Sequence, residues 1–429
     1  MTVLAGRGGL PYAAVVSSIL NQMNEIAPAK GETLARLILA PNEDRRLRAG
    51  HLWVYSNEVD KAKTPLKAFR PGQQALICDS RENPIGLGYV NPHSLICARL
   101  VSRHWKRKFN VKLITEHLRT ALAWREKHYA TPHYRWFFAE ADGLPGLILD
   151  RYGDVVVGQI STAGIEAMRE SVEKAIARVL SPVALIWRNM SKIRELEGLD
   201  RYDEVGFGTA PEYLKVSENG LQFQVPAQSG QKTGWFYDQS ANRQLMQSFM
   251  PAEKILDMFS YVGAWGITAA ANGAESVTCV ESSAAAVDQI NINAALNDVQ
   301  DRMTAVKCDA FDFMATACQQ KRQFDLIVLD PPAFIKKAKD KRNGLEAYRR
   351  INEMAMRLLS KDGLLFSCSC SFHLSSDELQ ILIQQAARHL DRHVQIVSVL
   401  QQSPDHPVHP AIPETRYLKG FVARVMPSR

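Results

Sequence analysis

An acidic residue and a thiol each follow an apolar, strand-like segment in the C-terminal half of the chain. Residues 324–334 have the sequence FDLIVLDPPAF, with Asp330 after the apolar run, and residues 363–372 have the sequence GLLFSCSCSF, which includes Cys370. The carboxyl ends of strands in a parallel α/β sheet face one crevice, so the two side chains could meet over one substrate. An acid that holds a planar ring edge, beside a thiol that attacks the ring, is suited to methylating a pyrimidine carbon.

The thiol supplies a reactivity that a pyrimidine ring lacks by itself. C5 of cytosine is a poor nucleophile, but thiolate addition at C6, with N3 held by a carboxylic acid, makes C5 an enamine-like carbon that can attack a sulfonium methyl group. Loss of the C5 proton then expels the thiol. A free cysteine has a pKa near ~8.5, so the site must assist its ionisation. Cys370 could instead be a buried structural thiol, and Cys368 would lie one strand step deeper in the sheet.

The loop after Asp330 is a candidate substrate contact. Pro331 and Pro332 cannot continue a strand or donate ladder hydrogen bonds, so they predict an extended loop at the sheet edge. Phe334 can stack on a flipped base, an interaction of roughly 1–3 kcal/mol. The basic residues among 336–342 could contact phosphates, or they could form a solvated loop.

A turn after an earlier strand is a candidate cofactor site. Asp257 ends the strand, Phe259, Ser260 and Gly263 form the turn, and we expect the next helix to begin near Ile267. A small residue at such a turn lets a ligand approach the backbone N–H groups of a helix start. The segment is not a GxGxxG fingerprint, so an ordinary strand–helix turn is the alternative.

Two further acids end the following strands. Glu281 comes 24 residues after Asp257 (281 − 257) and could accept hydrogen bonds from both hydroxyls of a ribose. Asp309 ends the third strand, where its carboxylate could take the exocyclic amine of an adenine. Either acid could instead cap the next helix. The chain has neither a phosphate-binding glycine triad nor a GxxxxGK[ST] loop, which favours S-adenosylmethionine over NAD or ATP.

Composition and charge narrow the class of protein. Seven cysteines, with no CxxC pair, favour a reducing cytoplasm over a disulfide framework or a structural zinc site, and we expect no metal. No apolar run approaches the ~18 residues of a membrane span. Residues 1–110 hold sixteen Lys and Arg against eight Asp and Glu, a net of +8, whereas the whole chain is +7. This predicts a polyanionic partner, with Arg45, Arg46 and Arg48 as candidate contacts; a solvated basic surface is the alternative.

The length of 429 residues is too great for a single core, so two or three domains are expected. Short apolar runs broken by turn signals over 34–102 are typical of a small all-β barrel or sandwich. Residues 103–212 combine helical and strand-like segments, which favours a small α+β domain. Strands and helices alternate over 213–429, which predicts a mostly parallel, doubly wound α/β sheet, and residues 1–33 form an N-terminal extension.

Several motifs together resemble the RlmI family of 23S rRNA (cytosine-C5) methyltransferases over about residues 34–429. The matching segments are LRAGHLWVYSNEV, ADGLPGLILDRYGD, GQKTGWFYDQSANR, FSYVGAWGITAAANGA, FDLIVLDPPAF, FSCSCSF and YLKGF. The resemblance implies an RNA-binding PUA domain, a central α+β domain and a Rossmann-like class I catalytic domain that uses S-adenosylmethionine.

The resemblance also implies roles in the catalytic site. Cys370 matches the family's nucleophile, and Asp330 matches the acid of its DPP loop. Ala333 and Phe372 differ from the Lys or Thr and from the small residue that many relatives have at these positions. These differences concern the exact substrate more than the reaction.

For the cofactor, the resemblance implies a site along three strand ends. Glu281, Asp309 and the turn Phe259–Gly263 match the family's cofactor site. Lys232 and Thr233 belong to another matching segment, which we place beside the methionine end of the cofactor.

Two other functions remain open at this point. The protein could methylate another RNA base, with Cys370 merely structural, or it could be a non-catalytic RNA-binding protein. The acids and the thiol at the strand ends argue against the second. The sequence is also compatible with a homodimer.

Overall fold

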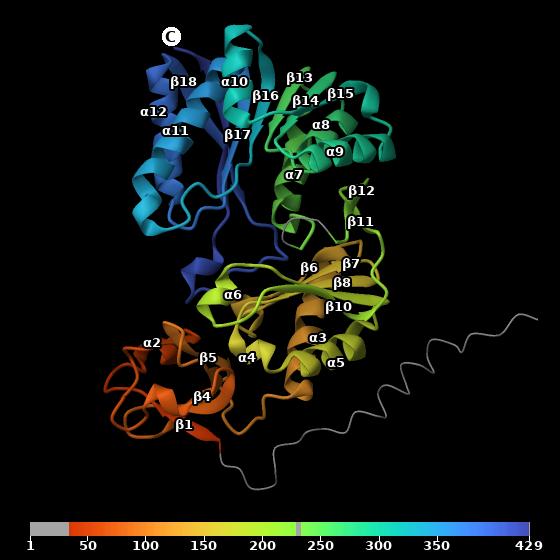
Figure 1. Ribbon diagram of the computed structural model, residues 1–429. Helices are drawn as coiled ribbons and strands as arrows, with labels where there is room; N and C mark the ends of the chain where they lie inside the picture. The colour runs from red at the N-terminus through yellow and green to blue at the C-terminus, as the bar shows by residue number, and fades with distance from the viewer. Residues whose placement is uncertain (1–33, 229–232, 429) are drawn as a thin grey trace, which may run out of the picture. The chain divides into compact units, whose positions relative to one another are not determined.

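The computed structural model describes residues 34–228 and 233–428. The described residues from Arg36 onward form one compact unit, which holds three main β-sheets and the helices around them (Figure 1). The N-terminal extension 1–33 and the candidate cofactor residue Lys232 lie outside the described residues.

The first sheet has five strands in the order β1-β3-β4-β5-β2. Its strands are β1 (Ala35–Ile38), β2 (Trp53–Tyr55), β3 (Gln73–Cys78), β4 (Pro84–Val90) and β5 (Ile96–Ser102), with the short helix α2 (Arg45–Arg48) and the 3-10 turn η1 (Leu66–Ala68) between them. β4 pairs antiparallel with β3 and β5, and β2 pairs antiparallel with β5. The all-β character predicted for this part of the chain is therefore confirmed.

The second sheet has the order β10-β9-β8-β7-β6. Its elements are α3 (Val111–His128), β6 (His133–Phe138), η2 (Ala139–Asp142), β7 (Leu147–Tyr152), β8 (Val155–Ile160), α4 (Ala163–Glu166), α5 (Arg169–Leu180), β9 (Ala184–Asn189), α6 (Ile193–Leu196) and β10 (Tyr202–Gly208). The helices α3 and α5 pack against each other. Only β8 and β9 run parallel, and the other neighbouring strands are antiparallel.

Buried polar contacts tie the first sheet to the second. Arg99 of β5 donates to Glu197 at 2.8 Å, and both side chains are buried. Asn91 also donates to the Glu197 carboxylate, at 2.8 Å. The indole N–H of Trp53 donates to Glu140 at 3.0 Å. A buried ion pair favours this one arrangement of the two sheets only while both charges are present, because a single unpaired charge is costly to bury.

The third sheet has seven strands in the order β15-β14-β13-β16-β17-β19-β18. Its strands are β13 (Lys254–Met258), β14 (Ser276–Glu281), β15 (Met303–Lys307), β16 (Phe324–Leu329), β17 (Leu359–Ser369), β18 (Arg392–Gln401) and β19 (Lys419–Pro427). The first five in this order are parallel, and β19 runs antiparallel to both β17 and β18. This is the predicted doubly wound α/β sheet, closed at one side by an antiparallel pair.

Helices cover both faces of the third sheet (Figure 1). The helices on one face are α7 (Ser240–Met246), α8 (Ala264–Ala271) and α9 (Ala284–Leu296), and those on the other are α10 (Ala310–Gln319), α11 (Lys341–Leu358) and α12 (Ser376–His389). The remaining elements are β11 (Tyr213–Glu218), β12 (Leu221–Pro226), η3 (Tyr237–Gln239), η4 (Gln247–Phe249), η5 (Gln300–Arg302), η6 (Ala338–Asp340) and η7 (Pro413–Thr415). The strands β13, β14, β16 and β17 are apolar on both faces because each face carries its own core.

Within residues 34–228 and 233–428, none of the helices has the length and apolar character that crossing a bilayer requires.

Candidate active site

The structure brings the predicted acid and the predicted thiol to one edge of the third sheet. β16 and β17 are parallel neighbours, with Leu329 opposite Ser367, so Asp330 and Cys370 follow adjacent strand ends. The Sγ of Cys370 donates to the carbonyl oxygen of Pro331 at 3.9 Å, a long contact that suits a weak S–H donor. The thiol therefore lies against the loop that Asp330 begins.

Asp330 is held by two side chains from distant segments. Its Oδ1 accepts from the Gln239 amide at 2.9 Å and its Oδ2 from the Trp265 indole N–H at 3.1 Å. Burial raises the pKa of Asp330, the two hydrogen bonds and Arg243 oppose the shift, and the nearby charge of Asp238 adds to it. A carboxyl group with a raised pKa is suited to donate a proton or a hydrogen bond to a ring nitrogen. Gln239 and Trp265 were not among the residues predicted for the site, although both lie in the motifs that carry the family resemblance.

The turn after Cys370 is fixed from two sides. The Nζ of Lys419 donates to the carbonyl oxygens of Ser371 at 2.6 Å and Leu374 at 2.7 Å. The hydroxyl of Tyr348 contacts Ser371 Oγ at 2.9 Å and accepts from Ser369 Oγ at 2.8 Å. The position of the thiol is thus set by buried and half-buried polar groups on α11 and β19.

Cys368 has the deeper position that its strand spacing predicts. It is 1% exposed, and burial, with the nearby Asp330 charge, raises its pKa well above the ordinary value for a thiol. A thiol that stays protonated is a poor nucleophile. The geometry therefore favours Cys370 over Cys368 as the reactive group.

Phe334 lies in a cluster of rings rather than alone at the crevice. Its ring centroid is 4.8 Å from that of Tyr348 and 6.3 Å from those of Phe259 and Phe311. In the loop before it, Pro331 is buried and Pro332 is exposed. Stacking of half-buried Phe334 on a base stays a prediction, and only the part of the ring not covered by these neighbours is available for it.

The candidate cofactor turn has an unusual backbone. Phe259, Tyr261 and Gly263 have φ values of 61°, 50° and 85°, all in the left-handed region that bulky residues rarely adopt. Such strain persists only where the surroundings hold it, and it is concentrated at ligand sites. The expected helix start near Ile267 is wrong by three residues, because left-handed Gly263 is the N-cap and α8 begins at Ala264.

Asp257 and Ser260 brace this turn from inside. Asp257 is fully buried, and its Oδ2 accepts from the Gly266 N–H at 3.1 Å. Ser260 Oγ donates to the Asp257 carbonyl oxygen at 2.7 Å. Burial raises the pKa of Asp257 to about 7. Their hydrogen bonds to the turn's own backbone show a supporting role, and direct contact with a cofactor stays a prediction.

The next two acids also bind backbone N–H groups. Glu281 accepts from Tyr261 at 3.0 Å through Oε2 and from Ser282 at 2.8 Å through Oε1. Asp309 is exposed and caps α10, accepting from the Phe311 N–H at 2.8 Å. The helix-capping alternative is therefore observed for Asp309, and its contact with an adenine stays a prediction.

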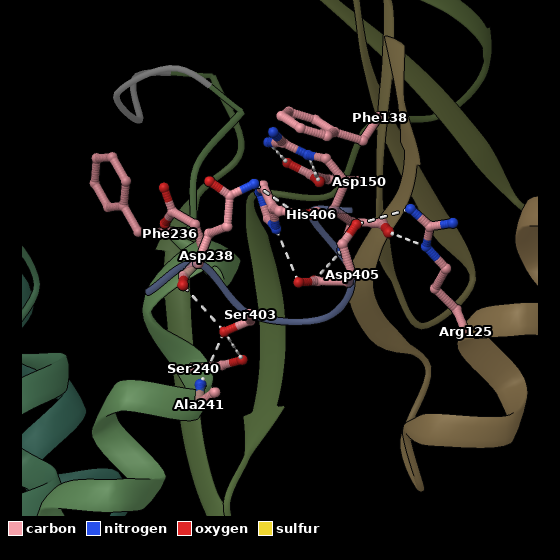
Figure 2. Close-up of polar contacts among 12 residues, drawn as sticks. Arg125, Phe138, Asp150, Phe236, Asp238, Ser240, Ala241, Ser403, Asp405 and His406 are labelled. Carbon is pink, nitrogen blue, oxygen red and sulfur yellow. Dashed lines mark hydrogen bonds and ion pairs between the residues drawn. The ribbon is translucent and has the colours of Figure 1, made fainter. Parts of the chain in front are cut away.

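A cavity of about 490 Å³ lies between the second sheet and the segment 233–238, and both polar and apolar side chains line it. Figure 2 shows the loop of Ser403, Asp405 and His406, which contacts the segment holding Asp238 on one side and Arg125 on the other. His406 Nδ1 is 2.8 Å from Asp405 Oδ1. None of these residues was singled out from the sequence, because the segments that line the cavity are far apart along the chain.

Two contacts connect this cavity to the candidate site residues. Thr233, predicted to lie near the cofactor, is part of its wall. Asp238 accepts from the Tyr417 hydroxyl at 2.5 Å, and the next residue, Gln239, holds Asp330. One wall residue of the cavity and one residue that holds Asp330 are therefore adjacent in the chain.

The three candidate RNA-binding arginines already have partners. Arg46 pairs with Glu58 at 2.6 Å, and Arg48 pairs with Asp79 at 3.0 Å and with Asp44. Arg45 donates to the neutral amide of Asn42 at 3.2 Å. All three lie on α2 in the first sheet's layer, and their contact with RNA stays a prediction.

Two solved structures share this architecture. A candidate SAM-dependent methyltransferase from Streptococcus mutans has a TM-score of 0.77 at 20% identity and covers 91% of this chain and 100% of its own. A structure of a candidate methyltransferase with bound SAH has a TM-score of 0.78 at 20% identity, with the same coverage. The fold is therefore that of the S-adenosylmethionine-dependent methyltransferases.

Sequence comparisons identify the family. Residues 37–103 match the model of a PUA-like domain, and residues 239–364 match the model described as conserved hypothetical protein 95. Ribosomal RNA large subunit methyltransferase I from Alteromonas mediterranea is 32% identical over 395 residues, which cover 91% of this chain and 99% of that protein. The chain belongs to the family of ribosomal RNA large subunit methyltransferase I. The family resemblance and the fold class inferred from the sequence are confirmed, and the relatives agree with the predicted S-adenosylmethionine cofactor.

Proposed function

We propose that this protein methylates C5 of a cytosine in 23S rRNA, with S-adenosylmethionine as methyl donor and a covalent bond between Cys370 and C6 of the base. The family supports large-subunit rRNA as the substrate. The observation that carries the cytosine-C5 chemistry is the contact between Cys370 Sγ and the Asp330–Pro331 loop at 3.9 Å. A thiol and an acid at one sheet edge are the two groups that this reaction needs.

The residues at the other strand ends fit the cofactor. Glu281 ends β14 and Asp309 follows the adjacent strand β15, where a nucleoside could lie across both strand ends. Asp257 Oδ1 and Thr233 Oγ1 are buried and make no hydrogen bond within the described parts of the chain. Buried polar atoms of this kind normally have a partner, so a polar ligand at the turn is consistent with them. The cofactor would supply the sulfonium methyl group.

In the proposed mechanism, Cys370 and Asp330 act at opposite positions of the pyrimidine ring, C6 and N3. The Cys370 thiolate forms an S–C6 bond, and Asp330 donates to N3 as electron density moves there. C5 then takes the methyl group as the bond between that methyl group and the sulfonium sulfur breaks. Loss of the C5 proton restores the C5–C6 double bond as the S–C6 bond breaks and the N3 proton returns to Asp330. The raised pKa of Asp330 favours the protonated form that the first step requires.

We further propose that the PUA-like module holds the RNA. The basic excess of residues 1–110 and the exposed Arg45 and Arg48 of α2 support this role. Phosphate contacts position a nucleic acid without reading its sequence. The choice of cytosine then depends on the catalytic part, where Pro332 and Phe334 belong to the loop that the thiol contacts at Pro331.

The test is methylation of 23S rRNA that lacks its own modifications, with methyl-labelled S-adenosylmethionine, followed by digestion to nucleosides. The Cys370→Ala variant is expected to lose all label in 5-methylcytidine. Cys368→Ala is the matched control, because it removes a buried thiol from the same strand and should retain turnover. Label in another nucleoside, or label that persists in Cys370→Ala, would refute the thiol mechanism.

A further inference from the structure

The antiparallel pairing of β17 with β19 brings a lysine to the catalytic thiol. Ser369 of β17 pairs with Lys419 of β19. Because Cys370 directly follows Ser369, Lys419 lies next to Cys370 on the neighbouring strand. The strands approach closely here, because a Cβ on Gly420 would lie 2.6 Å from the Ser367 carbonyl oxygen. Lys419 is half-buried and therefore cannot extend freely into solvent.

The two hydrogen bonds of Lys419 fix its ammonium group at this turn. They go to the carbonyl oxygens of Ser371 and Leu374, which lie on either side of the turn that follows Cys370. An ammonium group has three N–H donors. The two backbone contacts therefore leave one N–H group of Lys419 for a further acceptor.

The other titratable groups around Cys370 do not favour an anion. Four titratable groups on the neighbouring elements surround the thiol: Asp330, Tyr348, Cys368 and Tyr417. Asp238 accepts a hydrogen bond from the Tyr417 hydroxyl. A nearby carboxylate raises the pKa of a thiol, and a nearby cation lowers it. Lys419 interacts electrostatically with Cys370, and Glu378, which also interacts with Lys419, is itself paired with Lys341 at 2.6 Å.

We propose that Lys419 is a positioning residue that holds the Cys370 turn through its two hydrogen bonds and stabilises the Cys370 thiolate through its positive charge. The thiol proton leaves to solvent, and Lys419 stays protonated throughout, so no proton passes between the two side chains. The inference rests on the proposed function in taking Cys370 as the nucleophile. It identifies the assistance that a thiol needs to ionise near neutral pH.

The protonation of Lys419 limits the pH range of this effect. Burial lowers its pKa to about 8, and interaction with Cys370 opposes that shift. A lysine with this pKa is about nine-tenths protonated at pH 7 and loses its charge as the pH rises through 8. Its stabilisation of the thiolate is therefore present at neutral pH and declines in more alkaline solution.

The test measures alkylation of Cys370 by iodoacetamide in the full-length protein, without RNA or cofactor, from pH 5.5 to 9.5. Peptide mass spectrometry quantifies each cysteine, and half-exposed Cys318 on α10 is the internal reference. Lys419→Gln keeps a hydrogen-bond donor but removes the charge, and Lys419→Arg keeps both. We expect Lys419→Gln to slow alkylation of Cys370 about tenfold at pH 7, the effect of a one-unit rise in its pKa, while Lys419→Arg stays near the wild-type rate.

An unchanged pH profile in Lys419→Gln would overturn the proposal, and so would equal slowing in Lys419→Gln and Lys419→Arg, which would indicate packing instead of charge. Because the readout contains no RNA, it is separate from the 5-methylcytidine assay. A charge-dependent alkylation profile with no 5-methylcytidine formed would support the role of Lys419 and refute the proposed function. An alkylation profile that does not depend on charge, with 5-methylcytidine formed, would refute the role of Lys419 and support the proposed function.

Discussion

The carboxyl groups on the two sides of the crevice at the strand ends accept hydrogen bonds from different kinds of donor. On the side of β13, β14 and β15, Asp257, Glu281 and Asp309 accept from backbone N–H groups of nearby turns. On the side of β16 and β17, Asp330 accepts from the side chains of Gln239 and Trp265. A backbone donor persists through most substitutions, whereas a side-chain donor can be lost by one. The comparison therefore predicts that single substitutions change chemistry on the β16–β17 side and cofactor binding or stability on the other.

The largest effect should come from Asp330→Asn. The amide keeps an acceptor for Gln239 or Trp265 but carries no acidic proton, so kcat should fall by roughly 10²–10⁴-fold, the range for loss of a general acid. Steady-state kinetics with 23S rRNA measures this. Glu281→Gln on the other side of the crevice is the matched comparison and should raise KM for S-adenosylmethionine more than it lowers kcat. Equal losses of kcat in both variants would contradict the separation of the crevice into a chemical side and a cofactor side.

A smaller effect, on stability, is expected for Gly263→Ala. The residue has a φ of 85°, and an added Cβ would lie 3.1 Å from Ile290, so the backbone strain alone should cost about 1–3 kcal/mol of unfolding free energy. Gly220→Ala is a close control, because Gly220 has the same φ and open space around it. Urea denaturation should show both variants destabilised, with Gly263→Ala the more so. Calorimetry should show weaker S-adenosylmethionine binding in Gly263→Ala alone, and equal affinity in both variants would count against a cofactor site at the turn.

Trp265→Phe should shift the pH dependence of activity. The indole hydrogen bond lowers the pKa of Asp330, so its removal should raise that pKa further and move the alkaline limb of the kcat profile to higher pH. Because a hydrogen bond to a charged group is lost, kcat at neutral pH should change roughly tenfold. Gln239→Ala removes the other donor and should move the limb in the same direction. Opposite shifts in the two variants would show that Asp330 does not act as the acid.

Asp257→Asn should change how the stability of the protein depends on pH. Burial raises the pKa of Asp257 to about 7 in the folded protein, above its unfolded value near ~3.9. The folded state therefore holds the proton more tightly, and this contribution to stability is complete below pH ~4 and lost as the pH rises through 7. Because Asn is neutral at all pH values, the variant should gain melting temperature relative to wild type between pH 5 and pH 8. A difference that does not change with pH would contradict the buried, titrating carboxyl group.

Local sequence patterns were sufficient for the elements with strong apolar runs. The strands β13, β14, β16 and the second half of β17 were predicted from their apolar residues, which are typical of strands covered on both faces. β6 and β10 were missed, since β6 mixes His and Arg with aromatic residues and β10 contains Asp, Glu and two glycines. Their strand state depends on pairing with β7 and β9 rather than on their own composition.

The sequence by itself determined the chemistry available to this protein: a thiol, an acid and two further acids at the ends of strands, in segments that identify the family. Only the tertiary structure decided which groups control them. Gln239 and Trp265 lie 91 and 65 residues from Asp330, and Lys419 lies 48 residues from the turn it holds. Strand ends can be recognised locally because hydrophobic periodicity is local, but a pKa or a fixed turn depends on neighbours that meet only when the sheet is assembled.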